Sequence, residues 1–438
     1  MNRTLSAWLR MLAGIVILTT TAPLRANSAG LAAIPSLSVA ESWDSNIFNS
    51  TTNPQSDYIF RALPALTLSL SALETSLNLT SELLFNYYAD HPELNNTSQA
   101  LSKSFNLSLG KSLGNSVPLQ VTPTFFITPA VFFVTSYDYA YRNQYVKNSQ
   151  PGSLPSNSQP GLPPSDTYVT DQGGASTSTG GSITLDYYVT PRLSTSITGA
   201  AARQLFSIPS PTLVESTIYS VGAGVGYKVT PLFSSGAFFT GTLNRFDDGN
   251  ESKTYTAGLR GSYTLAENYS AGIGVGVTKY QNFCDNCISD NQGWSPYING
   301  SLYYVWKNFT ASLTASYQIA GGGSFGTTTR RGDITLDLSE QFAEHWSWYL
   351  SGYYQRNWDT TNTNTTSTYS NASGTAGIRY FPTYWASMQL SGSNLRQWSP
   401  ANAGNDLRRH EVTLGVSIGN VYKIAGNPAE VPDLYLRF

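Results

Sequence analysis

Charge and long hydrophobic runs are scarce in this sequence. Only 12% of its 438 residues are charged, and the formal net charge is −2. Without a strongly basic surface, we expect no nucleic-acid partner. No apolar run beyond the N-terminal segment approaches the roughly 20 residues that a membrane-spanning helix needs. These two absences argue against a nucleic-acid-binding protein and against a helical membrane protein.

Cysteine and histidine are also few, since the chain has two Cys and three His. Cys284 and Cys287 lie three positions apart in a polar connection. In an exported chain we expect a small disulfide between them. A metal site there would need further Cys or His nearby, and the sequence offers none. We therefore expect no metal and no cofactor.

Catalytic motifs are missing as well. His410, Asp406 and Ser399 are residue types that can form a catalytic triad, but their spacing matches no known nucleophile motif. The sequence has no phosphate-binding loop, haem motif or nucleotide fingerprint. We therefore expect that the protein is not an enzyme.

Alternation of apolar and polar residues dominates the sequence instead, and the stretch Glu251–Phe283 shows it best. Its first arm alternates Tyr255 and Leu259 with Thr256 and Arg260. A period of two places these two sets on opposite faces of a β-strand. Each arm reaches the about 9–11 residues with which a tilted strand crosses a bilayer. The stretch predicts a β-hairpin with one apolar face, which we expect to recur and to close into a barrel.

Short turns repeat along the second half of the chain. Each turn carries an aromatic residue or Leu, and these are spaced 36 to 40 residues apart. They are Leu193, Phe233, Tyr269, Phe309, Trp346 and Trp385. Aromatic residues at turns are typical of the girdle at a membrane–water interface. A soluble propeller repeats at a similar period, but each blade needs four strands where these units offer two long ones.

The predicted fold is all-β: an antiparallel, up-and-down transmembrane β-barrel of about 18 strands (16–20), with its amino end in the periplasm. A secreted solenoid or sandwich is the alternative. Residues 1–29 are interpreted as a signal peptide, because Arg3 and Arg10 precede the short apolar run Met11–Thr21. Residues 30–438 form the barrel, with a long outer loop at 136–176 and a tail at 420–438. The predicted location is the bacterial outer membrane.

Alternation also predicts which polar side chains face the lumen, because Arg or Lys facing lipid near the midplane costs about 2–4 kcal/mol. The predicted lumen residues are Glu82, Asp186, Tyr188, Arg260, Arg331, Asp333, Asp337, Tyr349, Tyr353, Arg379, Arg409 and Glu411. Two interpretations of this set remain open. The residues either line a polar conduit with aromatic side chains suited to sugars, or form ion pairs that brace the barrel.

Two segments resemble known outer-membrane proteins. Leu434, Leu436 and Phe438 alternate up to a terminal Phe, as in the signal that such barrels present to the barrel insertion machinery. The segment Leu37–Phe48 resembles the amino-terminal signature of a porin-like outer-membrane β-barrel family, through Glu41, Trp43, Asp44 and Asn46. That family is often associated with exopolysaccharide production and export. The resemblance implies a polysaccharide conduit that works with a periplasmic polysaccharide-export protein.

The sequence therefore predicts a pore among outer-membrane lipids, with export of a surface polysaccharide as the first hypothesis. A general or sugar-selective diffusion porin for small solutes is the alternative. A structural or adhesive barrel, whose loops bind something outside the cell, is the third class. At this strand number an aqueous channel is expected unless loops fill it.

Overall fold

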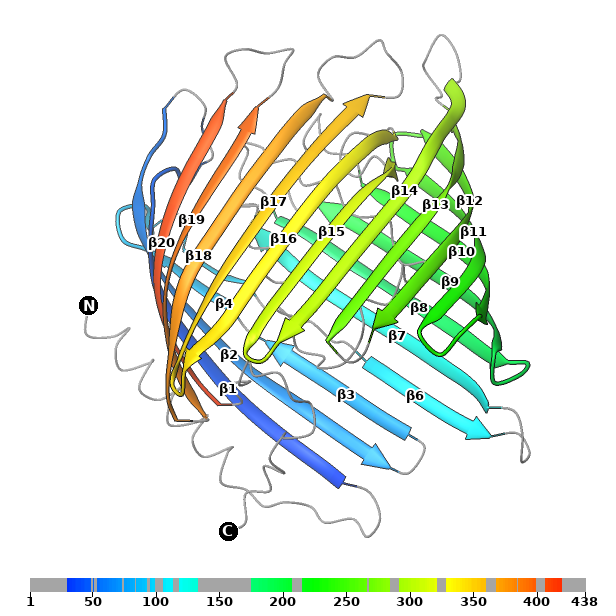
Figure 1. Cartoon of the computed structure of the whole chain (residues 1–438). Helices are drawn as coiled ribbons and strands as arrows, with labels where there is room; N and C mark the ends of the chain where they lie inside the picture. Colours follow the sequence, from blue (N-terminus) through cyan, green and yellow to red (C-terminus); the bar gives the residue numbers. More distant parts are fainter. Residues whose placement is uncertain are drawn as a thin grey trace.

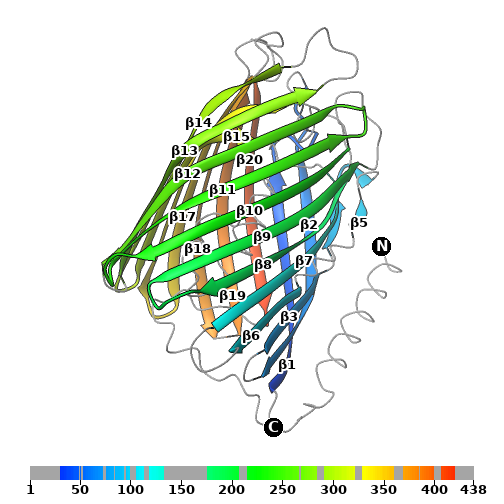
Figure 2. The same ribbon diagram turned by 90° about the vertical axis from the view of Figure 1, so that its right-hand side faces the viewer.

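The computed structural model describes residues 30–419, apart from residues 49, 51–52, 73–74, 83, 93–94, 99–104, 113–117, 133–174, 207–214, 266–267, 284–290, 321–327, 360–367, 384 and 399–405. In this part of the chain, twenty β-strand segments form one sheet. β1 (Gly30–Asp44) pairs with both β2 (Asp57–Ala72) and β20 (Leu407–Ile418). The sheet therefore closes into a barrel of tilted strands (Figures 1 and 2).

The pairing is antiparallel throughout the described strands, and most pairs join strands that are consecutive along the chain. The remaining segments are β3 (Thr75–Glu82), β4 (Leu84–Tyr88), β5 (Asn96–Ser98), β6 (Phe105–Ser112), β7 (Pro118–Phe132), β8 (Ala175–Tyr188), β9 (Leu193–Phe206), β10 (Ser216–Lys228), β11 (Phe233–Phe246), β12 (Glu251–Leu265), β13 (Tyr269–Phe283), β14 (Asn291–Trp306), β15 (Phe309–Ala320), β16 (Thr329–Ala343), β17 (Trp346–Asp359), β18 (Tyr369–Thr383) and β19 (Ala386–Trp398).

Four of the twenty segments occupy only two positions around the barrel. β3 and β4 both pair with β2, one along each half of it. β5 and β6 together occupy the next position, where β5 pairs with β4 and β6 pairs with β3. The described segments therefore make eighteen positions around the barrel, which confirms the predicted fold class and agrees with the predicted strand number.

Short and long connections lie at opposite ends of the barrel. The turns after β8 and β10 share the sequence Val-Thr-Pro, and in each the Thr hydroxyl accepts the backbone N–H three residues on, at 2.9 Å. Thr190 and Thr230 thus fix these turns, with the following Pro supplying a suitable φ. Gly30 pairs with Ser71 beside the β2–β3 turn, so β1 begins at the end with short turns. This is the periplasmic end in the predicted orientation, and the other is the outer end.

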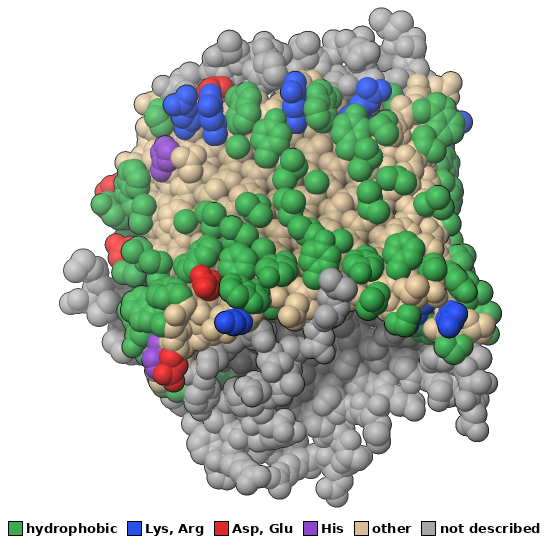
Figure 3. Space-filling view, in the orientation of Figure 1, with side chains coloured by type: hydrophobic (Ala, Val, Ile, Leu, Met, Phe, Trp, Pro, Cys, Tyr) green, Lys and Arg blue, Asp and Glu red, His purple; other side chains and the backbone are tan. Residues whose placement is uncertain are grey.

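The outward face of the strands is apolar and exposed. Ile197, Leu259 and Ile273 are 57%, 64% and 59% exposed, whereas Thr198 and Thr278 on the inward face are buried. Figure 3 shows hydrophobic side chains spread over this face. A soluble monomer does not expose an apolar surface of this extent, whereas lipid chains satisfy it.

Among the described residues, no helix is long and apolar enough to cross a membrane.

Some predictions fall outside the described residues. These are the signal peptide, most of the 136–176 loop, the Cys284–Cys287 disulfide, the 420–438 tail with its terminal Phe, and the side chain of Glu82. They stay predictions. At the end of the long loop, β8 already begins at Ala175, inside the predicted loop.

The lipid-facing assignment makes a first prediction. Val275→Arg places a charge next to the middle of β13 on the exposed face, and we expect it to lower the free energy of unfolding from lipid vesicles by about 2–4 kcal/mol. Gln281→Arg is the control, because Gln281 lies on the same face of β13 nearer the outer end. There the cost should fall to about 0–1 kcal/mol. Equal losses in urea titrations of the two variants would contradict the assignment.

Candidate functional site

The inner faces of β15 to β18 carry a row of polar side chains, here called the polar stripe. Alternation places it there, because Ile334 and Leu336 of β16 are 49% and 37% exposed on the opposite face. Its members are Ser312, Ser316, Arg331, Asp333, Asp337, Tyr349, Ser351, Tyr353, Gln355 and Arg379.

Near the outer end of the stripe, Arg331 and Asp333 form an ion pair. The Arg331 Nε donates to Asp333 Oδ1 at 3.2 Å, and the Ser316 hydroxyl donates to the same oxygen at 2.8 Å. The Arg331 guanidinium also donates to the Tyr353 hydroxyl at 3.0 Å, and that hydroxyl in turn donates to the Gln355 side chain. Hydrogen bonds to ionised groups are the stronger kind, so this part of the wall is held in one arrangement.

Nearer the periplasmic end, the Asp337 carboxylate accepts hydrogen bonds from Ser351 at 2.6 Å and from Ser312 at 3.4 Å. The Arg379 guanidinium lies 4.6 Å from the centre of the Tyr349 ring. A Cβ atom on Gly377 would come within 2.6 Å of that ring, so glycine lets Tyr349 lie against the wall. The stripe therefore continues along the strands from Arg331 to Arg379.

A second inward cluster lies on other strands of the barrel. Arg260 of β12 is within electrostatic reach of Asp186 on β8 and Tyr297 on β14. The Tyr297 ring meets Phe238 of β11 edge-on, with ring centres 5.3 Å apart. A Cβ atom on Gly224 would lie 3.2 Å from the Arg260 guanidinium, so this glycine leaves room for the long side chain. The lumen thus has charges of both signs beside aromatic rings.

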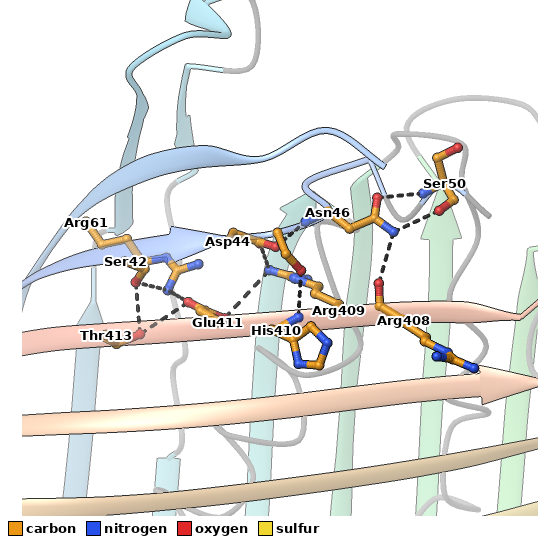
Figure 4. Close-up of polar contacts among 11 residues, drawn as sticks. Ser42, Asp44, Asn46, Ser50, Arg61, Arg408, Arg409, His410, Glu411 and Thr413 are labelled. Carbon is orange, nitrogen blue, oxygen red and sulfur yellow. Dashed lines mark hydrogen bonds and ion pairs between the residues drawn. The ribbon is translucent and has the colours of Figure 1, made fainter. Parts of the chain in front are cut away.

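Arg409 and Glu411, also predicted to face the lumen, are buried in a network at the seam between β1 and β20. Arg409 pairs with Asp44, and lies 3.7 Å from Glu411. The Arg61 guanidinium of β2 donates to Glu411 at 2.6 Å. The Asp44, Arg409 and Glu411 side chains are 0%, 3% and 5% exposed. Figure 4 shows these residues converging from three strands, which we call the seam network.

The Asp-x-Asn signature continues this network beyond the strand end. Asp44 accepts the backbone N–H of Asn46 at 2.9 Å. The Asn46 side chain donates to the carbonyl oxygens of Ser50 and Arg408, at 2.8 and 3.2 Å, and accepts the Ser50 N–H (Figure 4). The signature therefore ties the β1–β2 loop to the last strand of the barrel.

The β1–β2 loop is also tied to the next outer connection. Asp57 accepts the backbone N–H groups of Asp90 and His91 at 3.0 and 3.1 Å, and its carboxylate lies 3.0 Å from His91 Nδ1. Ile47, Ile59 and Tyr88 form a small buried cluster beneath, with Phe48 packed against it. His91 therefore has a structural role at this outer strand end.

The sequence-based interpretation missed several partners in these clusters. Asp44 and Arg61 are needed to neutralise Arg409 and Glu411, and Tyr297 and Phe238 join the Arg260 cluster. Alternation along β14 could have indicated Tyr297, because Trp294 and Ile298 on the other face are exposed.

The suggested triad does not assemble in the described residues. His410 points outward and is exposed, and its Nδ1 lies 2.9 Å from the Asn394 side-chain nitrogen. Ser399 lies outside the described residues. No group of three or more His, Cys, Asp or Glu that could hold a metal ion is found in the part of the chain that the structure describes.

A closed antiparallel sheet with an apolar outer face, a polar inner wall and short turns at one end defines a class of protein. This chain is an outer-membrane β-barrel.

No protein-family model matches the chain, and no curated protein matches it in sequence. Among solved structures, it is similar to Pseudomonas aeruginosa OccK5 (OpdH), with 10% identity and a TM-score of 0.43, covering 89% of this chain and 98% of that one. OccK3 (OpdO) of the same organism has 13% identity and a TM-score of 0.44, covering 88% and 96%. OccK2 (OpdF), solved in complex with glucuronate, has 11% identity and a TM-score of 0.43, covering 89% and 98%.

The seam network makes a second prediction. Glu411→Gln removes a buried charge that faces Arg61 and Arg409, and we expect the free energy of unfolding to fall by about 3–5 kcal/mol. Glu251→Gln is the matched control, because Glu251 pairs with Arg245 and Lys253 at the exposed outer end of β12. It should cost at most about 1 kcal/mol. Urea unfolding from lipid vesicles measures the free energy of unfolding of both variants. Equal losses would show that the seam network stabilises the barrel no more than an exposed ion pair does.

Proposed function

We propose that this barrel is a diffusion porin for small hydroxylated solutes such as sugars. The observation that carries the proposal is the polar stripe, where hydroxyl, carboxylate and guanidinium groups follow one another along the inner wall. Such groups can exchange hydrogen bonds with the hydroxyl groups of a passing solute. A barrel of this size is wide enough for an aqueous channel.

The charge balance of the stripe favours neutral or weakly charged solutes. Arg331 and Arg379 are balanced by Asp333 and Asp337, and the Arg331–Asp333 pair is internal to the wall. A wall whose charges are already paired attracts neither anions nor cations strongly. Tyr349 and Tyr353 add aromatic surface of the kind that stacks against sugar rings.

Polysaccharide export, the first hypothesis from the sequence, loses its main support. It rested on a resemblance in Glu41, Trp43, Asp44 and Asn46, and two of these residues serve closure of the barrel and its outer loop. Closure is needed whatever the barrel transports, so this motif does not indicate a cargo. Nothing in the described residues supports a periplasmic export partner, and the diffusion porin is therefore the preferred function.

Solute uptake tests the proposal directly. The protein reconstituted in lipid vesicles should admit monosaccharides and disaccharides, with a rate that falls steeply as the oligosaccharide lengthens. Osmotic swelling measures these rates, and vesicles without protein are the control. In a host that lacks the gene, surface polysaccharide should be unchanged. Failure of monosaccharide uptake, together with loss of surface polysaccharide, would restore the export hypothesis.

Charge changes in the stripe test its place on the channel wall. Asp333→Asn leaves Arg331 in excess and should favour anions, whereas Arg331→Gln should favour cations. The expected change in the permeability ratio is roughly twofold, as for one unit charge acting over ~10 Å in water. Reversal potentials in planar bilayers measure it.

Glu340→Gln is the control for these variants. Glu340 is a carboxylate on the same strand but on the outward face, where it accepts a hydrogen bond from Trp348 at 2.9 Å. Its loss should leave ion selectivity unchanged. If all three variants behave like the unmodified protein, the stripe does not line the conducting path.

A further inference from the structure

The outer end of the lipid-facing surface carries an unusual concentration of positive charge. On β19 and β20, Arg396 and Arg408 face outward and are directly opposite each other in the register. Both are exposed, and so is His410, two residues along the same face of β20. Like charges directly opposite on neighbouring strands are destabilising unless an anion lies between or beside them.

The protein neutralises only part of this positive charge. Asp406 accepts a hydrogen bond from Arg396 at 2.8 Å, and this carboxylate is itself 37% exposed. In the described part of the chain, Arg408 makes no ion pair. This surface therefore has two arginines and one carboxylate, which pairs with Arg396, so that a positive charge remains for an anion from outside the chain.

Aromatic side chains flank this surface and hold the cations at the height of the rim. The Arg396 guanidinium lies 5.2 Å from the centre of the Trp398 ring. The ring centres of Trp398 and Tyr354 are 6.3 Å apart. Two strands away, Arg356 lies over Trp358 at 5.2 Å. Figure 3 shows Lys and Arg side chains in a row along the upper edge of this face, with hydrophobic side chains between and below them. Aromatic rings of this kind sit at the headgroup level of a membrane.

The exposed apolar surface begins directly below the cations. Val412 and Leu414 follow Arg408 on the same face of β20 and are 49% and 54% exposed, and Leu390 of β19 is 55% exposed. The step from Arg408 to Val412 is about 13 Å along a strand. One molecule with acyl chains and an anionic headgroup can therefore contact both the cations and the apolar surface below them.

We propose that Arg396, Arg408 and His410 form a binding site for the phosphate groups of a phosphorylated, acylated glycolipid in the outer leaflet. The guanidinium groups bind the phosphates by charge-assisted hydrogen bonds, and the acyl chains lie on the apolar face below. The outer-membrane location and the charge complementarity select this occupant. The site lies on the outside of the wall, so it is independent of the proposed solute pathway.

Other outward cations at this height contact aromatic side chains, as Lys279 and Arg356 do, or are matched by carboxylates. The outward cations Arg245 and Lys253 share Glu251, and Arg203 lies 3.5 Å from Asp247. The direct Arg396–Arg408 opposition distinguishes the β19–β20 site from these pairs.

The test uses the full-length protein in phosphatidylcholine nanodiscs, with bisphosphorylated lipid A as the probe. Native mass spectrometry measures the lipid A bound per barrel across a titration. We expect the variant R396Q/R408Q to bind roughly 30-fold more weakly, since two basic side chains are lost from an anionic lipid contact. Dephosphorylated lipid A should bind the unmodified protein as weakly as lipid A binds the variant.

The control variant R192Q/K307N removes two exposed cations from turns at the periplasmic end, and Asn suits the positive φ of Lys307. It should bind lipid A like the unmodified protein, and single-channel conductance should be the same in all three proteins. Equal lipid A binding by R396Q/R408Q would overturn the proposal. Displacement of lipid A by an equal concentration of inorganic phosphate or phosphatidylglycerol would also overturn it. A change of oligomeric state in R396Q/R408Q would overturn it too, because it would assign this surface to a second copy of the chain.

Discussion

Closure of the sheet between β1 and β20 is the constraint on which the rest of the structure depends. In a bilayer each backbone N–H and C=O group must find a partner within the protein, and an open sheet would leave two edges unpaired. The β1–β20 register joins Leu37–Asp44 to Glu411–Ile418, a shorter ladder than the one between β1 and β2. Side-chain contacts reinforce it, with Ser38 and Ser42 hydrogen-bonded to Ser417 and Thr413 at 2.9 and 3.0 Å. The buried ion pairs of the seam network complete this junction between distant parts of the chain.

Once the sheet is closed, alternation alone assigns every side chain to lipid or to the lumen, and the two faces handle charge in different ways. Inside, Arg331 and Asp333 satisfy each other and are further bound by Tyr353 and Ser316. A wall of this kind keeps its shape without a bound ligand and binds a passing solute only weakly. That combination suits diffusion, in which a solute must leave the wall as easily as it enters.

The strands, their two faces and the short turns could be predicted from the sequence, because a period of two and the repeated Val-Thr-Pro turns are local signals. Partners across the barrel could not. Asp44 meets Arg409 only because the first strand pairs with the last in one register, and a shift by one residue would reverse the faces. The same holds for Arg331 and Tyr353, whose contact depends on the register of β16 with β17. Alternation predicted that Arg409 and Glu411 face inward, but not that the seam network buries them.

The position of a charge therefore says more about function here than its residue type. Arg409 at the seam is buried against Asp44 and serves closure. Arg408, one residue earlier, points to the opposite face, where Arg396 stands directly across from it. Exposing two like charges side by side on a lipid-facing surface is unfavourable for an isolated protein, and it becomes favourable only beside anionic headgroups. The outer rim is thus adapted to the membrane around it, while the wall is adapted to the water within.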